Sequence, residues 1–153
     1  MKKLTYLLLI SLFVMSGCQS KKEETTTVCT IEQAETKATL TLEADDDTIT
    51  KLTQHVATDL TSAFDQGLIT EDDVNKNAKE VKEKMEATKG VTYTYTLKDN
   101  VLTEDSVFDL EEASVEDLIE AKLLEVEGST KKGLSLKKTV ANYENLEFTC
   151  KSK

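Results

Sequence analysis

Two segments of the chain alternate apolar and polar residues, which is the period-two pattern of a half-buried β-strand. The alternating apolar positions are Ala38, Leu40 and Leu42 in the first segment, and Val91, Tyr93, Tyr95 and Leu97 in the second. Turn-forming residues follow each run, at 45–47 and at 98–100. Each segment therefore predicts a hairpin. Apolar residues of both parities follow the second turn, so the buried face of that return arm stays open.

The clearest helical pattern covers 70–90. Its apolar residues, Val74, Ala78, Val81 and Met85, form one stripe at helical spacing. Thr70 and Asp73 predict an N-terminal capping box, and Gly90 suits the position after the last turn.

Shorter elements follow towards the C-terminus. Ser114 and Asp117 start a second predicted helix that runs to about Leu124. A short helix is expected from about Ser135 to Tyr143, followed by a strand from Leu146 to Cys150. Near the other end, residues 28–31 either begin the first hairpin or form a separate short strand.

The order of these elements is strands, helix, strands, helices and strand. It predicts a single α+β domain, in which two or three helices pack on an antiparallel β-sheet.

An apolar run, Leu4–Met15, precedes all of these elements and follows Lys2 and Lys3. A helix of this length reaches only ~18 Å, against ~30 Å for the hydrocarbon core of a bilayer. The run fits a secretory signal peptide, expected over residues 1–17.

Small residues stand directly before Cys18, and the segment "MSGC" resembles the bacterial lipobox, with Met15 where leucine is more common. In a lipobox the cysteine thiol receives a diacylglyceryl group, with fatty acids such as palmitate, and becomes the new N-terminus. The alternative is an ordinary secretory signal that leaves a free thiol. Residues 19–27 contain no apolar side chain, which predicts a flexible tether over 18–27 and a folded domain over 28–153.

Acylation of Cys18 would leave Cys29 and Cys150 as an even pair. Exported proteins fold under oxidising conditions, so we expect a disulfide between these two cysteines that staples neighbouring strands. Two free thiols are the alternative.

The charge of the chain limits its partners. The formal net charge is −10, and it becomes −12 when residues 1–17, with two lysines, are removed. Such acidity argues against nucleic acid as a partner and suits a solvated, monomeric domain.

No set of residues forms a recognisable catalytic or metal site. His55 is the single histidine, no Gly-x-Ser-x-Gly motif surrounds any serine, and a solvent-facing histidine on a strand is the expectation. Zinc needs more histidine or cysteine ligands than the chain offers. Asp45–Asp47 lack the spacing of a calcium loop and predict a plain turn. The segment 128–135 has Leu134 where a phosphate loop needs lysine, which excludes that motif.

Two further groups have a structural and a functional interpretation. The acidic residues Glu104, Asp105, Asp109, Glu111 and Glu112 could supply paired carboxylates for glycosidase chemistry, but a solvated acidic surface is the simpler interpretation. Tyr93 and Tyr95 share one strand face and are expected in the core or on the sheet rather than as a ligand platform. No cofactor is expected.

Several of these features together resemble the YehR-like family of small bacterial lipoproteins, whose function is unassigned. Lys89-Gly90-Val91 and Lys132-Gly133-Leu134-Ser135-Leu136 occupy the places of the family's Lys-Gly-hydrophobic motifs. The resemblance covers about 18–148 and implies an antiparallel α+β domain. It provides no catalytic residues.

The sequence therefore predicts a lipid-anchored lipoprotein at the outer face of the cytoplasmic membrane, in a Gram-positive bacterium. We expect a non-enzymatic domain at the cell surface that binds an unknown envelope or extracellular protein, or a small ligand. The alternative is an enzyme that uses carboxylates such as Asp105 and Asp109 on envelope polymers.

Overall fold

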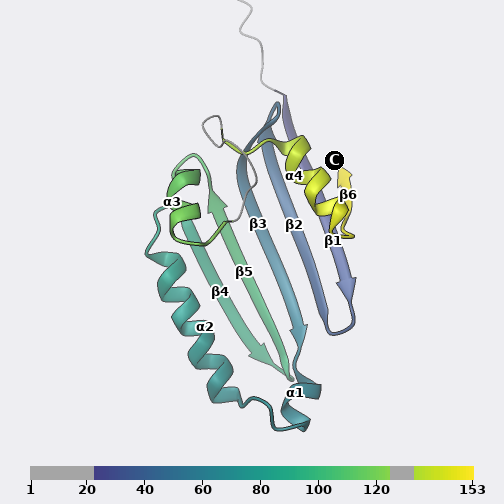
Figure 1. Ribbon diagram of the computed structural model, residues 1–153, viewed down its shortest axis with the longest axis vertical. Coiled ribbons are helices and arrows are strands. Elements are labelled where there is room, and N and C mark those ends of the chain that lie inside the picture. Colours follow the sequence, from purple (N-terminus) through teal and green to yellow (C-terminus); the bar gives the residue numbers. More distant parts are fainter. Residues whose placement is uncertain (1–22, 125–132) are drawn as a thin grey trace, which may run out of the picture.

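The computed structural model describes residues 23–124 and 133–153. The predicted signal peptide, Cys18 and the start of the predicted tether lie outside these residues, as does the segment 128–132. Figure 1 shows a single antiparallel sheet with helices along it. Its strands are β1 (Glu24–Gln33), β2 (Thr36–Asp45), β3 (Thr48–Asp59), β4 (Val91–Lys98), β5 (Val101–Asp109) and β6 (Thr149–Ser152). Its helices are α1 (Thr61–Asp65), α2 (Glu71–Glu86), α3 (Val115–Glu120) and α4 (Leu136–Asn145).

The strand order is β4-β5-β3-β2-β1-β6, and every neighbouring pair is antiparallel. β1, β2 and β3 form a meander, β4 and β5 form a hairpin beside β3, and β6 returns to pair with β1. This arrangement confirms the predicted α+β class with an antiparallel sheet.

The core lies on one face of the sheet. Alternate strand residues point to the same side, where α3 and α4 cover them. The largest fully buried side chains from strands and α3 are Phe108, Leu42, Ile49, Leu52 and Leu118. Phe108 is opposite Leu52 and Val91 in the sheet, which settles the buried face of β5 that the sequence left open.

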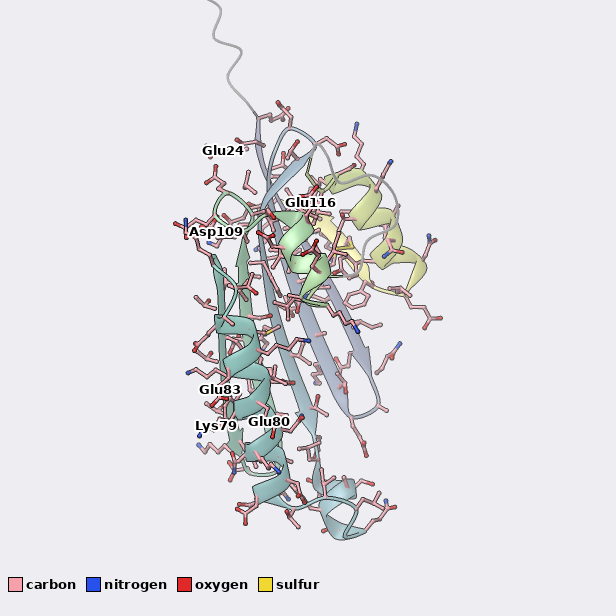
Figure 2. All side chains as sticks on the ribbon, turned by 60° about the vertical axis from the view of Figure 1, so that its left-hand side comes forward. Glu24, Lys79, Glu80, Glu83, Asp109 and Glu116 are labelled. Carbon is pink, nitrogen blue, oxygen red and sulfur yellow. A yellow bond between two sulfur atoms is a disulfide. The ribbon has the colours of Figure 1, made fainter. Side chains whose placement is uncertain are left out.

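Helix α2 packs separately, along β4 at the edge of the sheet (Figure 1). Val74 and Ala78 are its buried residues, while Lys79, Glu80 and Glu83 point to solvent (Figure 2). The predicted capping box is present: the Thr70 hydroxyl accepts from the Asp73 N–H, and the Asp73 carboxylate accepts from the Thr70 N–H.

Both predicted hairpins are present, and Asp99 and Asn100 adopt positive φ angles, as a two-residue turn of type I′ requires. Several boundaries differ from the prediction. β1 begins at Glu24, so residues 24–27 belong to the sheet and not to a tether. α3 ends at Glu120 rather than near 124, and β6 begins at Thr149 because α4 continues to Asn145.

The disulfide between Cys29 and Cys150 is present and joins directly opposed residues of β1 and β6. Cys29 is fully buried. The bond therefore fixes the short last strand to the edge of the sheet, as the sequence predicted.

Candidate functional site

The face of the sheet opposite the core, here called the open face, presents the other alternate set of strand side chains. None of the described residues in this set is buried. Threonine is the commonest residue of the set: Thr26, Thr30, Thr39, Thr41, Thr53, Thr92, Thr94, Thr96, Thr103 and Thr149. Hydroxyl groups therefore cover much of a broad, exposed surface.

Three cross-strand contacts between polar, charged or titratable side chains lie on the open face. They join Lys37 to Glu32 at 2.8 Å, Lys51 to Glu43 at 3.3 Å, and His55 to Asp105 at 2.7 Å. Each pair consists of direct partners in the sheet register, where opposite charges stabilise strand pairing. Lys37 and Lys51 therefore neutralise Glu32 and Glu43 on this face, whereas His55 and Asp105 are joined by a hydrogen bond.

His55 is exposed on β3, as the sequence predicted. Its Nδ1 atom contacts Asp105 Oδ1, the same type of contact that orients a catalytic histidine. Within 23–124 and 133–153, however, no hydroxyl is hydrogen-bonded to the other ring nitrogen. The pair therefore lacks a positioned nucleophile.

The three acidic residues of β5 do not converge, whereas Glu111 and Glu112 follow the strand in a turn where the Glu111 N–H donates to Asp109 Oδ1. Glu104 points to the helix-covered face and accepts a hydrogen bond from the Tyr93 hydroxyl, whereas its neighbour Asp105 points to the open face. Asp105 and Asp109 share the open face, but four strand residues separate them by ~13 Å. Paired glycosidase carboxylates are ~5–9.5 Å apart, so this pair does not match that geometry.

The two tyrosines of β4 are structural. Tyr93 is buried, and burial together with the hydrogen bond to Glu104 raises the pKa of its hydroxyl. Tyr95 donates to the carbonyl of Asn75 in α2 at 3.4 Å. Tyr95 therefore helps to hold α2 against the sheet, whereas Tyr93 links β4 to β5, and neither forms a ligand platform.

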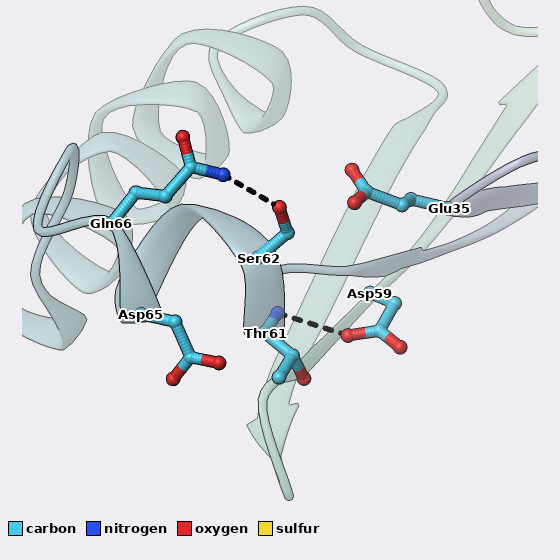
Figure 3. A pocket seen from close by; sticks show the side chains of 6 residues that line it. All are labelled: Glu35, Asp59, Thr61, Ser62, Asp65 and Gln66. Carbon is cyan, nitrogen blue, oxygen red and sulfur yellow. Dashed lines mark hydrogen bonds between the residues drawn. The ribbon is translucent and has the colours of Figure 1, made fainter.

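A polar pocket of about 470 Å³ lies where β3 ends and α1 begins (Figure 3). Its lining consists of Glu35, Asp59, Thr61, Ser62, Asp65 and Gln66. Glu35 comes from the β1–β2 turn, and its carbonyl accepts a hydrogen bond from the Asp59 N–H at 2.7 Å. The pocket thus joins two segments that are distant in sequence.

Local hydrogen bonds order this pocket. The Thr61 N–H donates to Asp59 Oδ1 at 2.9 Å, and the Gln66 amide donates to the Ser62 hydroxyl at 2.9 Å (Figure 3). The Thr61 contacts lower the pKa of Asp59, so this carboxylate stays ionised. The pocket can therefore accept hydrogen bonds from a polar or cationic group. Our sequence reasoning missed it, although Asp59-Leu60-Thr61 is a typical Asx-turn sequence.

The aspartates of the β2–β3 turn have a structural role. Asp47 accepts hydrogen bonds from the Ser135 hydroxyl and from the Lys137 N–H at the start of α4. The turn is plain, as predicted. In the described part of the chain, no group of histidine, cysteine or acidic residues is arranged to hold a metal ion.

No helix within the described ranges is long and apolar enough to cross a membrane. The candidate lipidation site, Cys18, lies outside those ranges, and so do residues 128–132 of the excluded phosphate-loop motif.

Comparison with known proteins gives a family and a fold. A sequence model described as "Protein of unknown function (DUF1307)" matches residues 24–149. The NMR structure of the E. coli YehR protein is similar, with a TM-score of 0.66 and 19% identity, covering 84% of this chain and 91% of that one. The NMR structure of a protein from Streptococcus pneumoniae TIGR4 has a TM-score of 0.54 and 18% identity, with 99% and 98% coverage. No curated protein matches the chain significantly.

Proposed function

The chain belongs to the DUF1307 family of proteins of unknown function, and we propose that it is a lipid-anchored binding domain of the bacterial cell envelope. In this proposal Cys18 carries a diacylglyceryl group, which holds the domain at the outer face of the cytoplasmic membrane. Two acyl chains give stable anchoring, whereas a single chain binds only weakly. The domain acts as a monomer, and its partner is an envelope protein or a small ligand.

One observation carries the anchoring part of the proposal. A basic start, a short apolar run and Ser16-Gly17-Cys18 stand in this order, and the folded domain follows almost at once, at Glu23. This is the order of signal, acylation site and domain that a lipoprotein needs. The disulfide between Cys29 and Cys150 agrees with an exported chain, since such bonds persist in oxidising compartments.

The surface of the domain supports a binding role rather than catalysis. Glu104 and Asp105 lie on different faces of β5, Asp105 and Asp109 are too far apart for a glycosidase pair, and within 23–124 and 133–153 no hydroxyl is hydrogen-bonded to the second ring nitrogen of His55. The open face and the pocket at α1 instead offer hydroxyl groups and carboxylates to a polar partner.

Anchoring is tested by the variant Cys18→Ala, expressed in a Gram-positive host and followed by cell fractionation. We expect loss of membrane retention and accumulation of the unprocessed precursor, and globomycin should reproduce the processing defect in the natural chain. Ser20→Ala is the matched control and should leave retention unchanged. Retention of the Cys18→Ala protein at natural levels would refute the proposed anchor.

Binding is tested by photo-crosslinking in intact cells. A photoreactive residue at Thr39, on the open face, or at Ser62, in the pocket, should yield a discrete adduct. The same residue at Lys79, on the outer surface of α2, is the control. Equal labelling at all three positions, or none at Thr39 and Ser62, would count against a binding role for these surfaces.

A further inference from the structure

The last strand, β6, is hydrogen-bonded to the sheet along one side. It lies at the edge beside β1, close to the C-terminus, and pairs with β1 over four positions of the register (Figure 1). The hydroxyl groups of Thr27 and Ser152 are hydrogen-bonded at 3.2 Å, and the Lys153 N–H donates to the Thr26 carbonyl at 2.9 Å. All of these hydrogen bonds join β6, and the residue after it, to β1.

β6 contributes little buried surface to the domain. Thr149, Lys151 and Ser152 are exposed, and Cys150 is half-buried. Fixing the backbone of one residue costs about as much free energy as one hydrogen bond returns in water, or more. Pairing of so short a strand is therefore marginal by itself. The disulfide to Cys29 is the link that keeps β6 in place.

The residues before β6 are held in a different way, by α4. Glu147 follows the last turn of α4 with φ +68°, and its N–H donates to the Glu144 carbonyl at 3.1 Å. The Phe148 N–H donates to the Tyr143 carbonyl at 3.0 Å, which completes a Schellman motif. The rings of Tyr143 and Phe148 also pack edge to face, with centroids 5.2 Å apart. The chain is therefore fixed to α4 through Phe148, and only the residues beyond it depend on β1.

The two sulfur atoms of the disulfide differ in access. Cys29 is 0% exposed, whereas Cys150 is half-buried on the edge strand. A thiolate from solvent therefore attacks the Cys150 sulfur, and Cys29 leaves as a thiolate. If the attacking group belongs to a dithiol, its second thiol breaks the mixed disulfide and releases Cys150. The dithiol becomes a disulfide, two electrons pass to the protein, and the two cysteines take up the two protons that the dithiol loses.

We propose that the Cys29–Cys150 disulfide is a redox switch: its reduction by a dithiol releases residues 149–153 from β1, while α4 and the rest of the sheet stay folded. This inference goes beyond the binding role proposed above and does not depend on the lipid anchor. Release leaves the backbone groups of Val28 and Thr30 without their partners in β6. Unpaired backbone groups at a sheet edge are a template for pairing with another strand. The oxidation state of one bond thus decides whether the β1 edge is closed or open.

The register of the sheet identifies the amides that report on release. The β1–β2 hairpin has a two-residue loop, and the residue pair that closes such a loop is hydrogen-bonded. Odd-numbered residues of β1 therefore bond to β2 and even-numbered ones to β6, in agreement with the bond from Lys153 to Thr26. The N–H groups of Val28 and Thr30 thus report on β6. The N–H group of Thr27, in the same strand, reports on β2.

The test is amide hydrogen exchange, followed by NMR before and after addition of dithiothreitol. It uses the chain from residue 18 onwards, which contains every described residue, with Cys18→Ser so that the paired cysteines are the only ones present. Local opening of β6 should accelerate exchange at Val28 and Thr30 by about a hundredfold or more, and by less than about tenfold at Thr27 and at Leu52 in the central strand β3. Equal acceleration at all four residues would show general unfolding and overturn the proposal. Unchanged exchange at Val28 and Thr30 in the reduced protein would overturn it as well.

A matched variant separates the bond from the reagent. With Cys29→Ala and Cys150→Ala added, exchange at Val28 and Thr30 should be fast from the start, and dithiothreitol should not change it. Slow exchange at both residues in this variant would show that β6 stays paired without the disulfide, which contradicts the proposed switch. The reduced natural pair provides the same comparison with both cysteine side chains present, so the proposal does not depend on how well the variant folds.

Discussion

The contrast between two glycines provides a quantitative test of the packing beside β4. Gly90 has φ +75° and precedes β4, and Gly67 has φ +66° in the connection between α1 and α2. An added Cβ at Gly90 would lie 2.9 Å from the Asp109 carbonyl oxygen and 2.9 Å from the Ala113 nitrogen. A Cβ at Gly67 would meet nothing within 4 Å. Both positions carry the conformational cost, and only Gly90 carries a steric one.

The two costs can be separated. A left-handed conformation costs a residue with a Cβ about 1–2 kcal/mol, which is the full cost expected for Gly67→Ala. At Gly90 the neighbours are backbone atoms that cannot rotate away. The Gly90 carbonyl also accepts the Asp109 N–H at 2.8 Å, so displacement would disturb the pairing of β4 with β5. Overpacking of this type adds about 1–3 kcal/mol, giving about 2–5 kcal/mol for Gly90→Ala.

The assay is urea unfolding of the wild type and the two single variants, monitored by circular dichroism at constant pH. The midpoint should fall further for Gly90→Ala than for Gly67→Ala, with unchanged slopes, since both variants keep the native fold. Equal losses of stability in the two variants would refute the close approach of the 109–113 backbone to Gly90. A smaller loss for Gly90→Ala than for Gly67→Ala would also refute it.

Three further predictions concern bonds that hold separate elements together. Removing the disulfide with Cys29→Ala and Cys150→Ala should lower the free energy of unfolding by up to about 5 kcal/mol, because the bond closes most of the chain into a loop. Calorimetry of the double variant and of the oxidised wild type measures this difference. Thr70→Ala should cost about 1 kcal/mol by removing the N-cap of α2, whereas Thr70→Ser should retain most of the stability in the same urea assay. Hydrogen bonds from the Lys137 N–H and the Ser135 hydroxyl lower the pKa of Asp47. The ionised carboxylate therefore stabilises the fold above the unfolded pKa of ~3.9, and this stabilisation is lost as the pH falls through the folded pKa. Asp47→Asn should therefore lose less stability than the wild type between pH 5 and pH 2, and identical acid profiles would contradict this role.

The sequence predicted the elements whose signals are local. Alternation marked β2 and β4, and the capping pair at Thr70 and Asp73 marked the start of α2. The end of α2 was less certain, because Gly90 suggested a helix terminus but stands three residues beyond the C-cap, Ala87, where the chain turns into β4. A glycine with positive φ marks a change of direction and does not by itself identify the element that ends there.

The start of β1 was misjudged because polarity was taken as evidence against folding. Residues 24–27 have no large apolar side chain, yet Thr27 is 2% exposed, and its hydroxyl is hydrogen-bonded with that of Ser152 at 3.2 Å. A threonine can be buried at the edge of a core when a neighbouring strand supplies a hydroxyl partner. That neighbour, β6, is more than a hundred residues away in sequence. The pair of cysteines was the one signal that indicated it.

The candidate site shows why local patterns predict elements better than surfaces. Glu104 and Asp105 are adjacent in sequence, and together they suggested a carboxylate cluster, but the two-residue period of a strand sends them to opposite faces. The actual partner of Asp105 is His55, fifty residues away, and Glu35 meets Asp59 through a turn of the β1–β2 hairpin. A one-residue shift in the β3–β5 register would remove the contact of His55 with Asp105 and turn every β5 side chain to the other face. The surfaces that could bind a partner therefore depend on strand register, which is set by packing of the buried face and is not visible in the charged residues themselves.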